Sequence, residues 1–453
     1  MRPPRRIGDR EDIVTYSSSQ VAGGEVRRRI LELAAGEVRR KVLGLGFWVQ
    51  SFRCFPWAGV NFYLKDELKV APSTLQMIHS SANVPMIAKA LYGFLSDNVN
   101  LCGQHRLPYI AIGALLQALS WFTIAMLPGS FISIPILTFF LFISNLGASI
   151  AEVANDAIVA ETGMQSFVWM LSSSAGALGN LLGGIAVDQL SPRVMFFIFG
   201  VIVAVQFSAI INIPESSLNL QKKRRKAPSS KPPTIGGRAE ELLVVLSNPE
   251  ILHSISWFAS SYALVPILMG TLFYYHTQQL GLSPSILGLT KVFSHVALLA
   301  LSMVYNKWLK QVPTRKLLSV LQITITLLML SDVLFVKGFY RGMGLPDGVY
   351  VVFFSGLQEA LCQFKVLPFS IMVAKLCPPG CEGSVMAFLM SATALAGIIS
   401  GCLGVTLAGV CGVAAGDFSG LPKAIVVEAT CCLLPLFWSS WIPGDQRRNI
   451  KRE

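Results

Sequence analysis

The chain has 453 residues, of which 53% are hydrophobic and only 14% charged, and its formal net charge is +12. Soluble globular proteins carry about 25% charged residues, so this composition excludes an ordinary soluble protein and indicates a helical membrane protein. The positive charge does not indicate nucleic-acid binding, because the Lys and Arg residues lie mostly in loops on one predicted side of the membrane.

Residues 1–42 form a polar, basic segment ahead of the first apolar run. This segment holds ten Lys or Arg residues, but its six acidic residues count against a transit peptide, and it shows no apolar core of a cleaved secretory signal. Residues 26–42 fit either an amphipathic helix on anionic lipid or a solvated tail. The sequence therefore predicts a cytosolic basic tail over residues 1–42.

Twelve apolar runs follow, each long enough to cross a bilayer as a helix. They predict an all-α multi-pass membrane protein with two six-helix halves at 43–213 and 250–441 and a basic tail at 442–453. The connector at 214–249 is rich in Ser, Lys and Pro and contains Lys222-Lys223-Arg224-Arg225-Lys226, so we expect a disordered linker there. The predicted spans are 43–64, 74–97, 107–128, 131–160, 166–188, 193–213, 250–275, 284–305, 314–336, 349–376, 383–411 and 421–441.

Two repeated sequence patterns indicate that the two halves arose by duplication. A Leu-x-x-x-Pro-Ser-x-Leu pattern occurs around Pro72 and again around Pro284. A Gly-x-x-x-Gly pattern that begins at Gly179 returns at Gly397, with nearly the same offset along the chain. Such a duplication is typical of a transporter whose binding site lies between the repeats.

The Lys and Arg residues also predict an orientation. If both termini lie on one side, that side gathers 27 Lys and Arg residues in its loops and tails, against 6 on the opposite side. Cytosolic loops are the positively charged ones, so we expect cytosolic termini and a cytosolic connector. The plasma membrane, the plastid envelope and the vacuolar membrane all remain compatible.

Ionisable groups inside the predicted spans are candidate functional residues, because a charge in the bilayer costs several kcal/mol unless it is paired or hydrated. Glu152 and Asp156 lie four residues apart on one helical face and can pair with Arg53 or Lys89, or carry a proton. The alternative is an ion-pair network that only fixes helix packing; for Asp332, His295 and Glu428 packing or a wet interface is the better interpretation. The predicted substrate-binding and translocation residues are Arg53, Lys89, Glu152, Asn155, Asp156, Lys291, Gln358, Glu359 and Lys365.

Five motifs follow one another in a fixed order along the chain. They are Arg53-Cys54-Phe55-Pro56, Phe62-Tyr63-Leu64-Lys65-Asp66, Lys89-Ala90-Leu91-Tyr92-Gly93-Phe94-Leu95-Ser96-Asp97, Asn155-Asp156-Ala157-Ile158-Val159-Ala160-Glu161 and Phe364-Lys365-Val366-Leu367-Pro368. Together these motifs resemble the folate–biopterin transporter family of the major facilitator superfamily, and its plant-type members most closely. The resemblance spans roughly residues 43–441 and implies a major-facilitator fold and the movement of folates or pterins. Gly93-Phe94-Leu95-Ser96-Asp97, followed by Arg106, is similar to the superfamily's loop between helices two and three, which implies a cytosolic gating role for Asp97 and Arg106.

The candidate residues suit such a substrate. Intramembrane cations can bind the two carboxylates of a folate, a carboxylate such as Asp156 or Glu152 can accept the adjacent donors of the pterin edge, and aromatic rings can stack on the pterin. The rings that we expect to stack are Phe55, Trp57 and Phe364. We expect alternating access with proton coupling through Glu152 or Asp156, no cofactor or metal ion, and a monomer in the lipid bilayer.

Two other functions fit the same sequence. A transporter of another aromatic or organic anion would use the same charged groups. A transporter-like receptor or scaffold would move nothing, and would depend on the basic run 222–226 rather than on Arg53 or Asp156. An enzyme is not expected, because the sequence shows no nucleophile–base pair, metal cluster or phosphate-binding loop.

Overall fold

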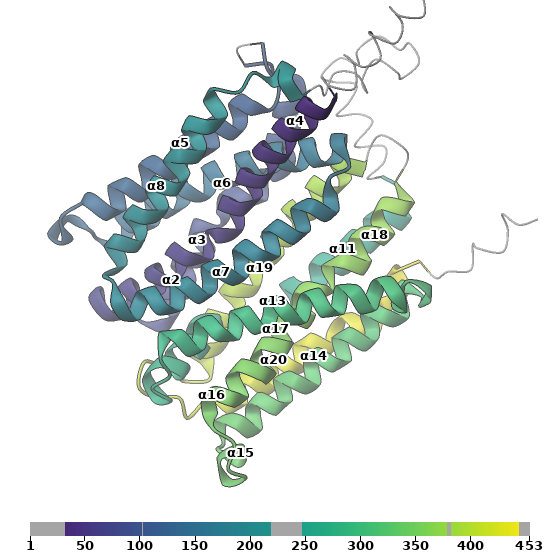
Figure 1. The fold of residues 1–453 in the computed structure, drawn as a ribbon. Coiled ribbons are helices and arrows are strands. Elements are labelled where there is room, and N and C mark those ends of the chain that lie inside the picture. The colour runs from purple at the N-terminus through teal and green to yellow at the C-terminus, as the bar shows by residue number, and fades with distance from the viewer. Residues whose placement is uncertain (1–31, 102, 219–246, 378–381, 444–453) are drawn as a thin grey trace, which may run out of the picture.

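The computed structural model describes residues 32–101, 103–218, 247–377 and 382–443, and the regular elements in these ranges are helices (Figure 1). The predicted tails up to residue 31 and from 444, and the part of the connector at 219–246 with its basic run, lie outside the described residues. The helices run back and forth between two ends of a bundle. We call the end where residues 32 and 443 lie the tail end, and the end with the connections 127–133, 337–346 and 411–420 the loop end.

Within the described residues, eight helices are long and apolar enough to cross a bilayer. They match eight predicted spans to within a few residues, and most begin with a Pro in the first turn, where its missing N–H costs nothing. They are α5 (Leu107–Met126), α6 (Ile134–Thr162), α7 (Gln165–Gln189), α8 (Pro192–Ile211), α13 (Pro284–Lys307), α14 (Thr314–Val336), α19 (Glu382–Val410) and α20 (Leu421–Leu433) with its continuation η8 (Leu434–Trp441).

The other four predicted spans coincide with interrupted helices, so the count of twelve remains a prediction. The first is already helical at residue 32, well before the predicted start of its span at 43. Four short helices, η3 (Gly129–Phe131), η4 (Glu215–Leu218), η6 (Leu309–Gln311) and α15 (Phe339–Gly342), lie in connections. The interrupted helices are 32–52 with α2 (Cys54–Phe62) and η1 (Tyr63–Glu67); α3 (Pro72–Ala82), η2 (Val84–Ala88) and α4 (Lys89–Asn98); α11 (Pro249–Ala263), α12 (Met269–Tyr274) and η5 (Tyr275–Gln279); and α16 (Asp347–Tyr350), η7 (Val351–Ser355), α17 (Gly356–Phe364) and α18 (Val366–Leu376).

Side chains from distant helices satisfy the backbone at the break 264–268, between α11 and α12. The Gln76 amide donates to the Ile267 carbonyl at 2.7 Å and accepts from the Gly270 N–H at 3.0 Å. The Ser400 hydroxyl donates to the Val265 carbonyl. Because lipid offers no partner to a free backbone group, these contacts make the break possible and join α3 and α19 to it.

The helices form two groups that lie side by side (Figure 1). The elements up to α8, the first group, gather toward the upper left of the figure, and α11 to η8, the second group, toward the lower right. Near the loop end one buried apolar cluster includes residues of both groups, and the Phe62 and Phe273 rings meet there at 5.2 Å. The other two buried clusters draw only on 251–442 and only on 42–218. The shared core therefore joins the groups near the loop end.

A glycine on α19 allows this helix to approach the break. A methyl group on Gly404 would overlap the Ile267 carbonyl oxygen and lie 2.7 Å from the Gln76 side-chain nitrogen. We expect Gly404→Ala to cost about 1–3 kcal/mol through overpacking and to lower the unfolding temperature of the purified protein. Gly397→Ala, two turns earlier on the same helix, adds a methyl group with nothing within 4 Å and should leave that temperature unchanged. Equal unfolding temperatures for the two variants would contradict the close approach.

Candidate functional site

The structure brings six of the eleven predicted site residues together as ion pairs. Two pairs lie within the helix bundle, one in each group, and the third closes the connection between α4 and α5. The remaining five residues have neutral partners or no partner. The pairs are Lys89 with Glu152, Lys291 with Glu359, and Arg106 with Asp97.

In the first group, Lys89 is the first residue of α4 and follows the 3-10 turn η2. Its ammonium lies 2.9 Å from Glu152 Oε1, and the Gln50 amide donates to Glu152 Oε2 at 2.8 Å. The two charged side chains are only 13% and 26% exposed. Both oxygens of Glu152 are thus occupied, which leaves this carboxylate little capacity for a ligand.

Asp156 lies one turn closer to the tail end on the same helix, α6. Its side chain is exposed, and within the described ranges it makes no hydrogen bond and no ion pair. Its negative charge lies close enough to those of Glu152 and Lys89 to interact with both. Of the two predicted carboxylates, Asp156 is therefore the one that is free for a ligand or a proton.

Arg53 occupies the single-residue break between helix 32–52 and α2. Its guanidinium donates to the Asn145 side-chain oxygen, while Asn145 donates to the Ala82 carbonyl at 2.8 Å and to the Asn83 side chain at 3.0 Å. Arg53 Nε is buried without a partner. Within the described residues Arg53 thus forms no ion pair with Glu152 or Asp156, although the Glu152 charge lies close enough to act on its guanidinium.

In the second group, the Lys291 ammonium lies 2.7 Å from Glu359 Oε1, with side chains 48% and 28% exposed. The two ion pairs thus connect corresponding helices. In each group the lysine lies on the helix that follows a loop-end turn, and the glutamate lies on the second helix after it along the chain. Their depths differ, because Lys89 lies several turns after Pro72 whereas Lys291 lies only two turns after Pro284. The difference of roughly three turns corresponds to about 15 Å of helix, so Lys291 lies nearer the loop end.

Two predicted residues, Asn155 and Lys365, are buried, and Gln358 is half-buried with a buried side-chain oxygen. Asn155 is buried against Gly46, and its side-chain oxygen lacks a partner, as does that of Gln358. Lys365 lies between α17 and α18 inside the second group and is 3% exposed. Its ammonium donates to the Ser261 hydroxyl at 3.0 Å and lies 3.9 Å from the Tyr262 ring centre.

Of the three rings predicted to stack on a substrate, only one is accessible. Trp57 is half-buried and lies 4.7 Å from the His79 ring. Phe55 stacks on Phe52 in the core, and Phe364 is fully buried. Packing within the helix groups covers Phe55 and Phe364 in this structure, so a stacking role for these two rings stays a prediction.

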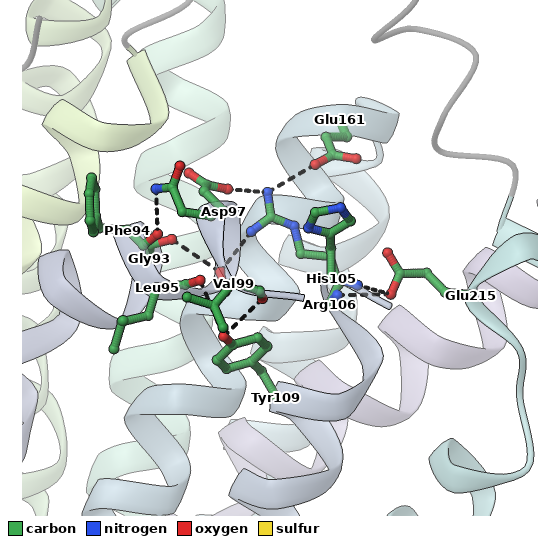
Figure 2. Close-up of polar contacts among 12 residues, drawn as sticks. Gly93, Phe94, Leu95, Asp97, Val99, His105, Arg106, Tyr109, Glu161 and Glu215 are labelled. Atoms are coloured by element: carbon green, nitrogen blue, oxygen red, sulfur yellow. Dashed lines mark hydrogen bonds and ion pairs between the residues drawn. The ribbon is translucent and has the colours of Figure 1, made fainter. Parts of the chain in front are cut away.

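The predicted gating residues lie at the tail end (Figure 2). Arg106 is buried, and its guanidinium contacts Asp97 at the end of α4, Glu161 at 3.0 Å near the end of α6, and the Ser96 hydroxyl at 2.7 Å. Burial alone would lower the pKa of Arg106, but the charges of Asp97 and Glu161 outweigh burial and raise that pKa. The arginine therefore stays charged and ties α4, α5 and α6 together.

Two members of this cluster were missed in the sequence. Glu161 and Glu215 both lie far from Arg106 along the chain. One oxygen of Glu215 accepts from the backbone N–H groups of His105 and Arg106, each at 2.8 Å, and so caps the start of α5 (Figure 2). The sequence did contain a signal for both residues. Glu161 and Glu215 each follow the end of a predicted span that finishes on the same side of the membrane as Arg106.

The chain is similar to known proteins along most of its length. The model of the BT1 family matches residues 50–452. "Probable folate-biopterin transporter 7" of Arabidopsis thaliana is 51% identical, covering 96% of this chain and 98% of that protein. "Probable folate-biopterin transporter 9, chloroplastic" of the same plant is 39% identical over 88% of this chain and 76% of that protein. Among solved structures, the inward-open xylose transporter of E. coli has a TM-score of 0.64 at 14% identity, covering 91% and 98% of the two chains, and shows a shared fold.

The Lys89–Glu152 pair can be tested as a pair. Lys89→Met leaves the Glu152 charge unpaired, so we expect it to cost about 1–3 kcal/mol, less than the roughly 3–5 kcal/mol of a fully buried pair because both groups are partly exposed. Adding Glu152→Gln should restore most of the lost stability. Thermal unfolding of the purified variants measures both effects.

The control for these substitutions is Lys41→Met, which breaks the exposed Lys41–Glu37 pair and should change the free energy of unfolding little. If the Lys89 and Glu152 substitutions instead act additively, the pair is not a coupled unit.

Proposed function

This chain belongs to the BT1 family, and on that premise we propose that it carries folates or pterins across a membrane. It is an integral membrane transporter and not an enzyme, with a fold of the major facilitator type. The folate–biopterin family resemblance found in the sequence is confirmed. The identity of the substrate is the part that we propose, and the names of the two relatives support it.

The proposed mechanism is alternating access by twelve spans in two halves, 43–213 and 250–441. It is supported by the distribution of the apolar core, which is shared near the loop end and separate in each group elsewhere. Two bodies joined in this way can rock about a site between them. With the tail end in the cytosol, as the Lys and Arg distribution predicts, the apolar core shared by both groups lies away from the cytosol, while α4 and α19 also contact each other nearer the tail end, where the Ala90 N–H donates to the Ser391 hydroxyl at 3.0 Å.

The observation that carries the substrate assignment is the mixture of charges around the bundle centre. Arg53 has no carboxylate partner, Lys291 is half exposed, and Asp156 has no partner within the described chain. Cations at different depths suit a substrate with carboxylates at one end.

Proton coupling is assigned to Asp156 rather than to Glu152. Lys89 and Gln50 already hold both oxygens of Glu152, whereas Asp156 can take up a proton without breaking an ion pair. A proton on Asp156 removes a negative charge from the site and thereby eases the entry of an anion. The same carboxylate can in this way link proton and substrate binding.

Uptake of labelled folate and of an unconjugated pterin tests the proposed function. We expect saturable uptake into vesicles that contain the full chain, stimulated by an inward proton gradient. Asp156→Asn should abolish the stimulation, and Arg53→Gln should lower uptake at least tenfold, because each removes a charge that the substrate or the proton meets. Asp417→Asn changes an exposed loop carboxylate and serves as the matched control. Correctly inserted protein that takes up neither compound would refute the folate and pterin assignment.

The gating role of Arg106 has a separate test. Arg106→Gln should lower uptake at least tenfold at equal protein levels, because α4, α5 and α6 lose their common contact. Arg106→Lys should recover only part of the rate, since an ammonium lacks the fork that reaches Asp97 and Glu161 together. Arg40→Gln, at an exposed position near the same end, is the control. Wild-type uptake by Arg106→Gln would exclude a gate at this cluster.

A further inference from the structure

Two buried carboxylates in the second group have no part in the proposed site. Asp332 on α14 and Glu428 on α20 are 9% and 6% exposed. Neither forms an ion pair within 4 Å inside the described ranges. The helices α14 and α20 pack along each other, and the Asp332 charge acts on Glu428. The pair is thus an uncompensated concentration of negative charge in the helix bundle.

The nearest cation is kept apart from this pair by an amide. Lys365 donates to Gln322 Oε1 at 3.2 Å, and Gln322 in turn donates to the Cys432 carbonyl at 2.7 Å. Cys432 lies one turn after Glu428 on α20. Lys365 therefore contacts α14 directly and α20 only through this amide, without touching either carboxylate. On α14 the contact lies nearly three turns from Asp332 toward the tail end.

A chain of hydroxyl groups connects the pair to the loop end. The Tyr340 hydroxyl on α15 lies 3.0 Å from Ser331 Oγ, which lies 2.7 Å from the Tyr350 hydroxyl. The Tyr350 hydroxyl donates to Asp332 Oδ1 at 3.0 Å. Tyr340 is half-buried and lies in the connection 337–346, so the chain begins near the surface and ends at a buried carboxylate.

Glu428 in addition contacts the backbone of an interrupted helix. The Leu268 N–H, in the break between α11 and α12, hydrogen-bonds to the Glu428 carboxylate. A charged acceptor makes such a bond about twice as strong as a neutral one. Neutralising Glu428 would therefore weaken the contact that holds this break in its present shape.

From this arrangement we propose that Asp332 and Glu428 form a proton-binding pair, reached from the loop end through Tyr340, Ser331 and Tyr350. Two ionised carboxylates without a cation are costly in the bilayer, and one proton bound by either of them removes most of that cost. The proton moves along the hydroxyls, each of which accepts one proton and passes on another, and forms a neutral carboxyl group at the pair. The titratable and charged groups around the pair are Tyr340, Tyr350, Cys362, Lys365, Cys431 and Cys432.

The coupling of this pair to transport rests on the proposed function. Because Glu428 holds the break between α11 and α12, its protonation state biases the helix that joins the two groups through Gln76. A proton at this pair can thus influence the rocking of the groups without touching the substrate. Asp156 and the buried pair would then act at two separate points of one cycle.

Infrared spectroscopy of the purified full-length protein tests proton binding without any substrate. At neutral pH we expect a protonated-carboxyl band that is lost or shifted in both Glu428→Gln and Asp332→Asn, and unchanged in Glu67→Gln, which alters an exposed carboxylate at the loop end. Tyr350→Phe should keep the band but slow its exchange with deuterium, because the route loses one hydroxyl. A band that neither carboxylate substitution affects would overturn the proposal.

Vesicle uptake tests the coupling and separates the two proposals. Glu428→Gln should reduce the stimulation by an inward proton gradient at least fivefold, while uptake without a gradient changes less than twofold. Gradient stimulation that stays at the wild-type level in Glu428→Gln would overturn the coupling role. If the wild type takes up neither folate nor pterin, the proposed function fails, and the infrared result alone decides whether the pair binds a proton.

Discussion

Inside a bilayer every backbone N–H and carbonyl needs a partner within the protein, and the architecture of this chain depends on how its interrupted helices meet that requirement. The eight uninterrupted helices satisfy their own backbone and can face lipid. At the break 264–268 the partners are Gln76 from α3 and Ser400 from α19. A break of this kind is possible only where other helices cover it. The interruptions therefore mark the protein-lined interior, and the contact through Gln76 joins the two helix groups.

Charges accumulate at these same interruptions. Arg53 occupies the break before α2, Lys89 follows the turn η2, Lys365 separates α17 from α18, and Glu428 contacts the Leu268 amide. The interruptions are not equally irregular, because Arg53 and Lys365 keep right-handed helical backbone angles while the break 264–268 is unwound. Other charges, among them Glu152, Lys291 and Asp332, lie on the uninterrupted helices α6, α13 and α14. Interruptions thus hold some of the intramembrane charges, and ion pairs or burial between helices accommodate the others.

The sequence predicted the helical membrane class, the positions of the apolar runs and the family, because these depend on composition, hydrophobic length and local motifs. The partners of the charges were not predictable. Helical spacing allowed Glu152 to meet either Arg53 or Lys89, and the turn η2 decides between them by placing Lys89 2.9 Å away. Glu161 and Glu215 come to Arg106 only through the packing of α6 and of the segment after α8. The burial of Phe364 likewise follows from contacts between helices that no local pattern encodes.

The two helix groups resemble each other in the arrangement of their helices but differ in where their charged groups lie. Both contain a Lys–Glu ion pair between corresponding helices, and both bury a glutamine on the helix after the first tail-end turn, Gln117 and Gln322. The first group places a free carboxylate, Asp156, beside its ion pair, whereas the second buries Asp332 and Glu428 away from Lys291. Coupling requires that two binding events favour the same rearrangement, and neither event has to occur at the other's site. In the proposed arrangement the substrate meets charges of both groups, and a proton is held inside the second group. This arrangement satisfies the requirement, because the break at 264–268 contacts Glu428 on one side and the first group, through Gln76, on the other.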